Sequence, residues 1–307
     1  MRAATWFLAV TFAISGAALS ADKPLEVKAG DAIPAKRITS DHLAPFKHDL
    51  PAVLPLVVVS FQTQATEKGG SGSLGMGIFG SGSLQYTLDG VSADAMQKIT
   101  DDVQEAVEGE LKAAGWQILP AEQATSLDAY KAWAKSPDPS GVETKRAFFS
   151  VGKGTNQLTS SELERVFVGG KRPLLGNGPV LGGWTAAPSI CKLGLALNAK
   201  VILFRAIVNF ANISAGKRGL FTGSQTWTSQ TDLEVSYAEM DVYPPDASGA
   251  TPARLHTDLP VTLRSDFVKD VQKSGSHHTI VADPDRYARD TVEAIRTIAK
   301  GFAAQSK

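Results

Sequence analysis

The spacing of hydrophobic residues changes twice between positions 56 and 111, and each change restricts the fold. The run Leu56–Phe61 is almost continuously apolar and rich in valine, which is typical of a strand buried on both faces. From Leu84 to Leu88 apolar and polar residues alternate, which predicts a strand with one exposed face. The next apolar residues recur at steps of three and four and predict one helical stripe: Met96, Ile99, Val103, Val107 and Leu111.

The second half of the chain continues this mixture of strands and helices. Asp283 followed by Pro284 predicts the start of the last helix, because Asp caps helices and proline suits the first helical position. A bulge is expected near Ala238–Glu239, where the buried parity changes, and a turn at Gly216–Gly219. Further helix patterns occupy 121–135 and 189–197, and strand patterns occupy 201–210, 233–242 and 255–263.

The order of these elements predicts the fold class. Strands joined by turns pair antiparallel, whereas strands joined by a helix can pair in parallel. We therefore expect an α/β (α+β) protein with one mixed β-sheet flanked by helices. The domain is expected at 53–307, after an extended arm at 21–52. A long Gly-rich, irregular insert is expected at about 136–188, and a mobile Gly- and Ser-rich loop at 69–83.

The N-terminal residues resemble a secretory signal peptide rather than part of the fold. Arg2 precedes an uncharged apolar stretch, and the small residues before Ala21 suit a cleavage site, which predicts a signal peptide at 1–20. The apolar stretch is shorter than the roughly 20 residues of a spanning helix. The chain contains one Cys, Cys191, so neither a disulfide framework nor a lipid-anchor Cys at the cleavage point is expected. These features predict a periplasmic protein, with outer-membrane association as an alternative.

Composition and motifs exclude some functions and leave others open. Lys+Arg and Asp+Glu both number 31, so no global charge attracts nucleic acid. The glycines at 75–80 match a dinucleotide pattern, but a strand rather than a helix follows them. His277 and His278 are adjacent and favour a solvated turn over a metal site. Cys191 is expected to be a small buried residue. No catalytic, cofactor-binding or metal-ligating residue is predicted.

Charged residues in turns and on one helix face suggest contacts rather than chemistry. Two basic pairs lie in Gly-rich turns, where ordinary solvated turns are the alternative interpretation to a contact with anionic lipid or another subunit. Together with one Trp of the insert they are the candidates for partner or ligand contacts: Lys171, Arg172, Trp184, Lys217 and Arg218. The acidic residues of the first helix are expected on its solvated outer face: Asp101, Asp102, Glu105 and Glu108.

Two blocks of sequence resemble the curli-secretion-channel (CsgG-like) α/β family. The first spans Leu56 to Leu119 and ends in Gly-Trp-Gln-Ile-Leu. The second begins with Leu-Gly-Leu-Ala-Leu-Asn-Ala-Lys-Val-Ile-Leu-Phe at 193–204 and continues through 233–243 to the closing helix. The family also includes periplasmic lipoproteins of polysaccharide export and resembles the N-terminal domain of TolB. The resemblance implies a sheet with flanking helices and carries no catalytic residues.

The chain departs from this family in two respects. It lacks the N-terminal Cys of the lipid-anchored members. Its candidate membrane hairpins, 60–88 and 209–231, do not alternate over the roughly 9–11 residues per strand that crossing requires. The resemblance therefore implies a soluble periplasmic member whose association with membranes is at most peripheral.

The sequence leaves three functions open. The first is a non-enzymatic envelope protein that assists assembly or secretion by contacting envelope proteins or copies of itself, for example in a ring. The second is a carrier for a small apolar ligand or lipid, held between the sheet and the Gly-rich insert at 152–188. The third is a hydrolase with an unrecognised site. No residue pattern discriminates among them.

Overall fold

A computed structural model describes most of the chain after residue 23. The described ranges are 24–41, 46–68, 83–134, 142–150, 156–168, 187–218, 225–230, 232–247 and 251–306. In 67–68, 134, 142–150, 156–165, 212–218 and 225–230 they comprise the backbone alone. The predicted signal peptide at 1–20 and nearly all of the predicted loop at 69–83 lie outside the described residues.

The described residues form five α-helices, one short 3-10 helix and fifteen strands. The helices are α1 Ala93–Ala113, α2 Ala121–Thr125, α3 Asp128–Ala134, α4 Ala187–Leu197 and α5 Pro284–Gln305, with the 3-10 helix at Ala35–Arg37. The first strands are β1 Leu25–Val27, β2 Ile38–Asp41, β3 Ala52–Lys68, β4 Ser83–Asp89, β5 Ile118–Leu119, β6 Val142–Ser150, β7 Asn156–Phe167 and β8 Lys200–Asn209. The remaining strands are β9 Asn212–Arg218, β10 Gln225–Gln230, β11 Leu233–Tyr243, β12 Ala253–Thr257, β13 Val261–Leu263, β14 Val268–Ser274 and β15 His277–Ala282.

Thirteen strands form one mixed sheet. Its path runs β1-β13-β11-β8-β3-β4-β15-β14, and β2, β5, β6, β7 and β12 pair with strands of this path or with one another. β3 is parallel to β8 and β15 is parallel to β4, whereas β11 is antiparallel to β8. β9 and β10 form a separate two-stranded sheet. The predicted class, a mixed β-sheet flanked by helices, is confirmed.

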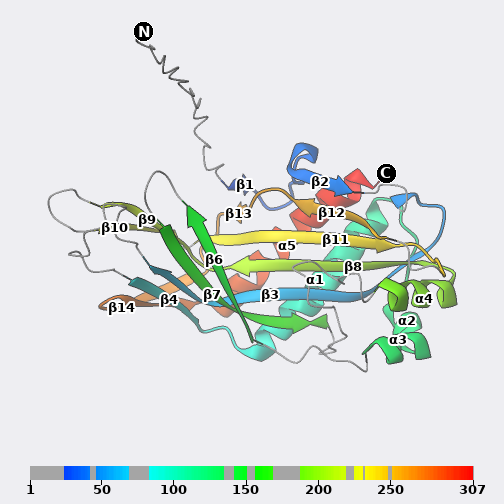
Figure 1. Cartoon of the computed structure of the whole chain (residues 1–307), viewed down its shortest axis with the longest axis horizontal. Helices are drawn as coiled ribbons and strands as arrows, with labels where there is room; N and C mark the ends of the chain where they lie inside the picture. Colours follow the sequence, from blue (N-terminus) through cyan, green and yellow to red (C-terminus); the bar gives the residue numbers. More distant parts are fainter. Residues whose placement is uncertain are drawn as a thin grey trace, which may run out of the picture.

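Helices cover both faces of this sheet. α1 and α5 lie side by side across one face, and α2, α3 and α4 gather at one end of the molecule (Figure 1). Successive residues of β3 divide between two hydrophobic clusters, because neighbouring side chains of a strand point to opposite faces. Val57 and Val59 belong to the cluster with α1 and α5, whereas Leu56 and Val58 belong to the cluster with α2, α3 and α4.

Local signals begin both long helices and end the first, and the predicted start of the last helix at Asp283 is confirmed. The hydroxyl of Ser92 accepts a hydrogen bond from the backbone N–H of Ala95 at 3.1 Å and caps α1. Gly115 ends this helix with φ of 100°, a value that glycine adopts without strain. The carboxylate of Asp283 accepts a hydrogen bond from the N–H of Arg286 at 3.1 Å and caps α5. These caps leave the apolar stripes of both helices facing the sheet.

The predicted arm at 21–52 is part of the sheet. β1 runs parallel to β13, β2 runs antiparallel to β12, and β3 already begins at Ala52. Between β1 and β2 the N–H of Ile33 donates to the carbonyl of Thr297 in α5 at 3.4 Å. The predicted boundary between arm and domain at 52/53 therefore falls inside strand β3. The prediction of a separate arm was wrong because strands as short as β1 and β2 show little hydrophobic periodicity of their own.

The predicted irregular insert at about 136–188 contains two long strands. β6 and β7 pair antiparallel, and β7 pairs with β3 from Val58 to Lys68. The first turn of α4 also falls inside it. Residues 169–186 lie outside the described part of the chain. The prediction of an irregular insert was therefore wrong for 142–150 and 156–167, where sheet pairing compensates for a weak local pattern.

Several smaller predictions also need correction. Gly216–Arg218 belongs to β9 and is not a turn, because it pairs with β10. The bulge in β11 falls between Val235 and Tyr237, before the predicted Ala238–Glu239. The predicted strand at 255–263 is divided into β12 and β13, and the predicted helix at 121–135 is divided into α2 and α3. The hairpin of β14 and β15 was not predicted.

Candidate functional site

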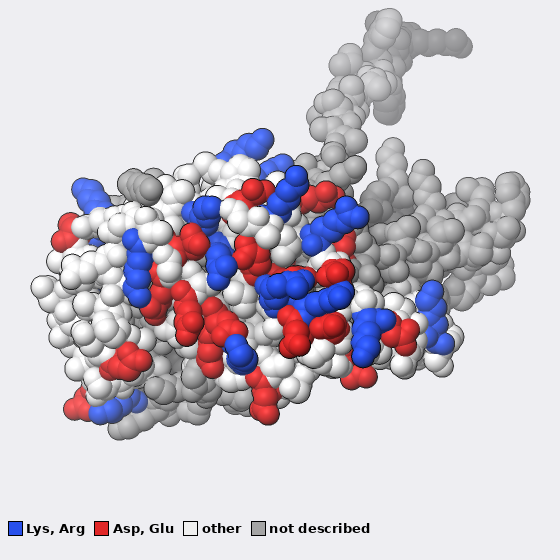
Figure 2. All heavy atoms as spheres, turned by 180° about the vertical axis from the view of Figure 1, so that it is seen from behind, with Lys and Arg blue, Asp and Glu red and all other residues white. Residues whose placement is uncertain are grey.

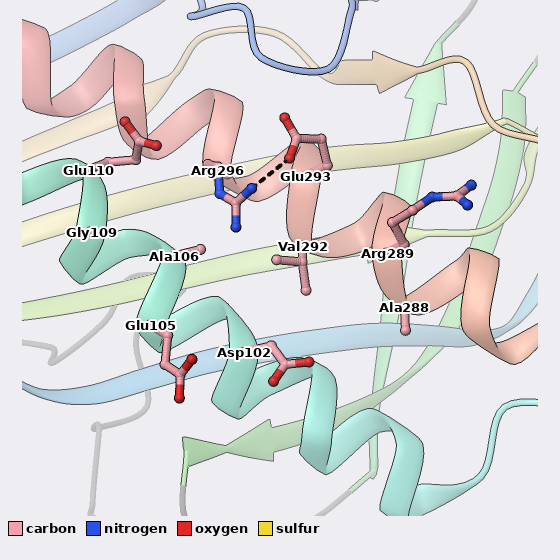
Figure 3. Close-up of a pocket in the computed structure, with 10 residues that line it drawn as sticks. All are labelled: Asp102, Glu105, Ala106, Gly109, Glu110, Ala288, Arg289, Val292, Glu293 and Arg296. Atoms are coloured by element: carbon pink, nitrogen blue, oxygen red, sulfur yellow. Dashed lines mark hydrogen bonds and ion pairs between the residues drawn. The ribbon is translucent and has the colours of Figure 1, made fainter.

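A groove of about 630 Å³ lies between the outer surfaces of α1 and α5, and we call it the helix groove. Figure 2 shows the face that carries these helices, where acidic and basic side chains are interleaved. Figure 3 shows the groove itself, with α1 along one side and α5 along the other. Ten residues line it: Asp102, Glu105, Ala106, Gly109, Glu110, Ala288, Arg289, Val292, Glu293 and Arg296.

The α1 side of the groove is acidic. Asp102, Ala106 and Glu110 follow each other at four-residue steps, so they form one row along the helix. Glu105 lies beside this row and is exposed. The row faces outward because the apolar stripe that includes Val103 is buried against the sheet. The sequence pattern correctly predicted an outer position for Asp102 and Glu105; it did not place Glu110.

The α5 side carries two arginines that already have acidic partners. Arg296 forms an ion pair with Glu293 one turn away, at 3.0 Å. Arg289 forms one with Asp290 at 2.9 Å and approaches Asp266 at 3.7 Å. Glu293 is held further by the backbone N–H of Gly30, which donates to its carboxylate at 2.7 Å. The cationic side of the groove is therefore internally neutralised.

Small and apolar side chains form the floor between these charged rims. Val292 points from α5 toward α1, opposite Ala106 (Figure 3). Ala106 is buried, whereas Ala288 and Val292 are half-buried. A Cβ added at Gly109 would meet no atom within 4 Å, so this glycine leaves open space rather than a close helix contact. The floor can accept an apolar side chain from outside.

The charges around the groove do not balance. Four lining carboxylates, of Asp102, Glu105, Glu110 and Glu293, face two guanidinium groups, which leaves an excess of two negative charges. Asp102 is paired with Lys98 at 2.6 Å outside the groove. Within the described part of the chain, Glu105 and Glu110 form no ion pair.

A second groove of about 530 Å³ lies on the other side of α5, against β1 and β13. It shares Arg289 and Glu293 with the helix groove and adds the exposed Lys28 and Arg264. The two hollows therefore flank α5 and carry different charge, acidic toward α1 and more basic toward β1.

Buried charges lie on the opposite face of the sheet. The hydroxyl of Tyr237 donates to the carboxylate of Glu239 at 2.6 Å, and Arg254 donates to Asp241. Both carboxylates are fully buried. Loss of hydration, together with the charge of Glu239, outweighs the hydrogen bond and the charge of Arg254 and raises the pKa of Asp241 to about 7. This cluster ties β11 to β12, and it does not line either groove.

None of the residues that the sequence nominated for contacts is among the described residues that line the groove. Lys171, Arg172 and Trp184 lie outside the described residues. Lys217 and Arg218 lie in β9, and their side chains are not described.

The residues that the sequence analysis considered and set aside do not line the groove. Cys191 is buried in α4, as predicted. His277 and His278 begin β15 and are not in a turn, and the His278 ring packs edge-on against Tyr86 at 4.9 Å. Burial lowers the pKa of His278, and Lys273 adds to this effect. Among the described residues, no cluster of three or more His, Cys, Asp or Glu could hold a metal ion.

The sequence patterns missed the groove because they describe one helix at a time. The charged residues of α1 and α5 are separated by more than half of the chain, and no local pattern shows that the two helices lie side by side. One available signal was the row of arginines at 286, 289 and 296, which marks the exposed edge of an otherwise buried last helix.

Comparison with known proteins adds no relative. The chain matches no family model, no curated protein and no solved structure. None of the helices in the described ranges is both long enough and apolar enough to span a membrane.

Proposed function

We propose that this is a non-enzymatic, exported envelope protein that assists assembly or secretion by binding a protein partner in the helix groove. The observation that carries the proposal is the composition of the groove, an apolar floor of Ala106, Ala288 and Val292 between two charged rims. Protein interfaces combine an apolar centre with a polar, solvated rim in the same way.

The same composition argues against a small-molecule site. Pockets for small ligands are mostly apolar or aromatic, with few polar groups. Six of the ten residues that line the helix groove are charged and none is aromatic. Such a surface suits the mixed side chains of a protein segment better than an apolar ligand.

The carrier alternative loses part of its basis. It placed a ligand beneath the insert at 152–188, but β7 in that segment is hydrogen-bonded along the edge of β3. The part of the insert that forms β7 is thus held in the sheet and cannot act as a movable lid, and no observation among the described residues favours a carrier. Export rests on the signal-peptide pattern at 1–20, and the CsgG-like resemblance fits a periplasmic accessory protein.

Cross-linking in cells tests the proposal. A photoreactive side chain at Gly109 would project into open space at the groove, whereas one at the exposed Gln123 of α2 lies outside it. We expect a covalent adduct with an envelope protein from position 109, found in the periplasmic or membrane fraction after cell fractionation.

Two results would contradict the proposal. One is the absence of any adduct from position 109 in a correctly exported protein. The other is the same set of adducts from positions 109 and 123, because contacts with neighbours by chance do not depend on the groove.

A further inference from the structure

We infer that the segment bound in the helix groove is basic, with Lys or Arg side chains directed at α1. This inference rests on the proposed function and names the chemistry of the partner. The residues that line the groove carry two excess negative charges. A basic segment is attracted by these charges, whereas an acidic segment is repelled by them.

The arrangement of ion pairs shows where the excess charge resides. On α5, Arg296 is neutralised by Glu293, and Arg289 is neutralised by Asp290. On α1, Lys98 neutralises Asp102. Within the described residues, Glu105 and Glu110 form no ion pair, and Lys98, whose charge also acts on Glu105, is already paired with Asp102, so the unbalanced charge lies on α1.

The spacing of these two carboxylates defines the ligand further. Glu110 lies five positions after Glu105, which corresponds to about 7.5 Å along the helix axis and about 140° around it. The two carboxylates therefore lie on opposite edges of the α1 side of the groove, and Ala106 and Val292 form the floor (Figure 3). A segment that places an apolar side chain on the floor and carries basic side chains on both of its flanks would meet both carboxylates.

The net negative charge of α1 as a whole also favours a basic partner. Its 21 residues contain six acids, Asp94, Asp101, Asp102, Glu105, Glu108 and Glu110, and two bases, Lys98 and Lys112. The field along this helix therefore attracts cationic segments during encounter and repels anionic ones, an anionic lipid surface included. The bound partner is thus a basic protein segment rather than a membrane.

A pair of peptides tests this inference on the purified exported protein. The probes are a labelled amphipathic peptide with Lys on one face and Leu on the other, and the same peptide with Glu in place of every Lys. We expect the Lys peptide alone to bind in fluorescence anisotropy, with affinity that falls as salt rises. Replacing both Glu105 and Glu110 by Gln should weaken it about tenfold, which corresponds to about 1.4 kcal/mol.

Two further variants make the test specific. Glu105→Lys with Glu110→Lys should abolish binding of the Lys peptide and create binding of the Glu peptide. The matched control, Glu122→Lys with Asp270→Lys, makes the same change in net charge at exposed sites away from the groove and should leave both affinities unchanged. Circular dichroism verifies that each variant is folded, and the Gln variants preserve side-chain shape if the Lys variants do not fold.

The outcomes separate this inference from the proposed function. Equal binding of both peptides, preference for the Glu peptide, or equal loss in the control variant would overturn the basic-segment inference. Position 109 could still form its adduct in cells while the Lys peptide does not bind. In that case the groove binds a protein segment that is not basic, and the basic-segment inference fails while the proposed function stands. If position 109 forms no adduct, the proposed function fails independently.

Discussion

Arg254 holds the buried carboxylate of Asp241 with two hydrogen bonds. Nε donates to Oδ1 at 2.7 Å and Nη2 donates to Oδ2 at 3.0 Å. The two residues lie opposite each other where β11 pairs with β12. Asp241 is fully buried, so a shift of β12 by one residue would leave a charge without its partner. The pair therefore specifies the register of β12 and, through it, of β2.

Removing one partner of this pair should be costly. We predict that Arg254→Ala lowers the free energy of unfolding by about 3–5 kcal/mol at alkaline pH, because it leaves the ionised carboxylate of Asp241 buried and unpaired. Urea denaturation followed by circular dichroism measures this. The double replacement Asp241→Leu with Arg254→Met should recover most of the loss, since two apolar side chains leave no buried charge. A loss below about 1 kcal/mol in Arg254→Ala would contradict the assignment.

The raised pKa of Asp241 predicts a specific dependence of stability on pH. Burial raises this pKa from 3.8 to about 7 in the folded protein. Between these values the folded state keeps a proton that the unfolded state releases, so stability should fall as pH rises through this window. The slope from this one group is at most about 1.4 kcal/mol per pH unit.

Asp241→Asn isolates this contribution, because the amide does not titrate. Urea midpoints of the wild type and the variant should be compared at several pH values between about 4 and 7, the window that the two pKa values define. The wild-type stability should decline relative to the variant as pH rises. Parallel profiles would show that Asp241 titrates at its ordinary pKa in the folded protein.

Ile33 of the N-terminal arm packs against Gly301 of α5, so a larger side chain at position 301 should loosen the arm. A Cβ at Gly301 would overlap the Cγ1 atom of Ile33 and lie 3.0 Å from its carbonyl oxygen. We predict that Gly301→Ala destabilises the protein by about 1–3 kcal/mol through overpacking. It should also release the arm, so that trypsin cleaves at Lys28 faster. Gly109→Ala is the matched control, and it should stabilise by about 0.5–1 kcal/mol, because its Cβ meets open space.

If trypsin cleaves the wild type and Gly301→Ala at Lys28 at the same rate, the arm does not depend on this contact. The result matters for the site as well, because Gly30 of the arm donates to Glu293 at the edge of the helix groove. An arm that is detached would remove this hydrogen bond and leave Glu293 held by Arg296 alone.

Elements with strong local signals were predictable. The stripe from Met96 to Leu111 and its cap at Ser92 correspond to α1, and Asp283 begins α5. Strands that form only by pairing with another strand were not predictable. β9 needs β10, and β7 needs β3, and neither strand has a hydrophobic pattern strong enough to indicate it alone. The division of 255–263 into two strands likewise follows from pairing with β11 at two separate places.

The candidate site shows the same limit. The sequence predicted that Asp102 and Glu105 face solvent, and this is correct because the buried stripe of a helix determines which residues lie opposite it. It did not predict that Val292 and Arg296 lie across a groove from them.

The sequence alone therefore determined the class of the fold, the two long helices and their caps, since these depend on residues within one or two turns of each other. Only the tertiary structure decided that α1 and α5 lie side by side, that the arm joins the sheet, and that Asp241 meets Arg254. Packing on a common sheet brings together residues far apart in the chain, and no local periodicity encodes that proximity.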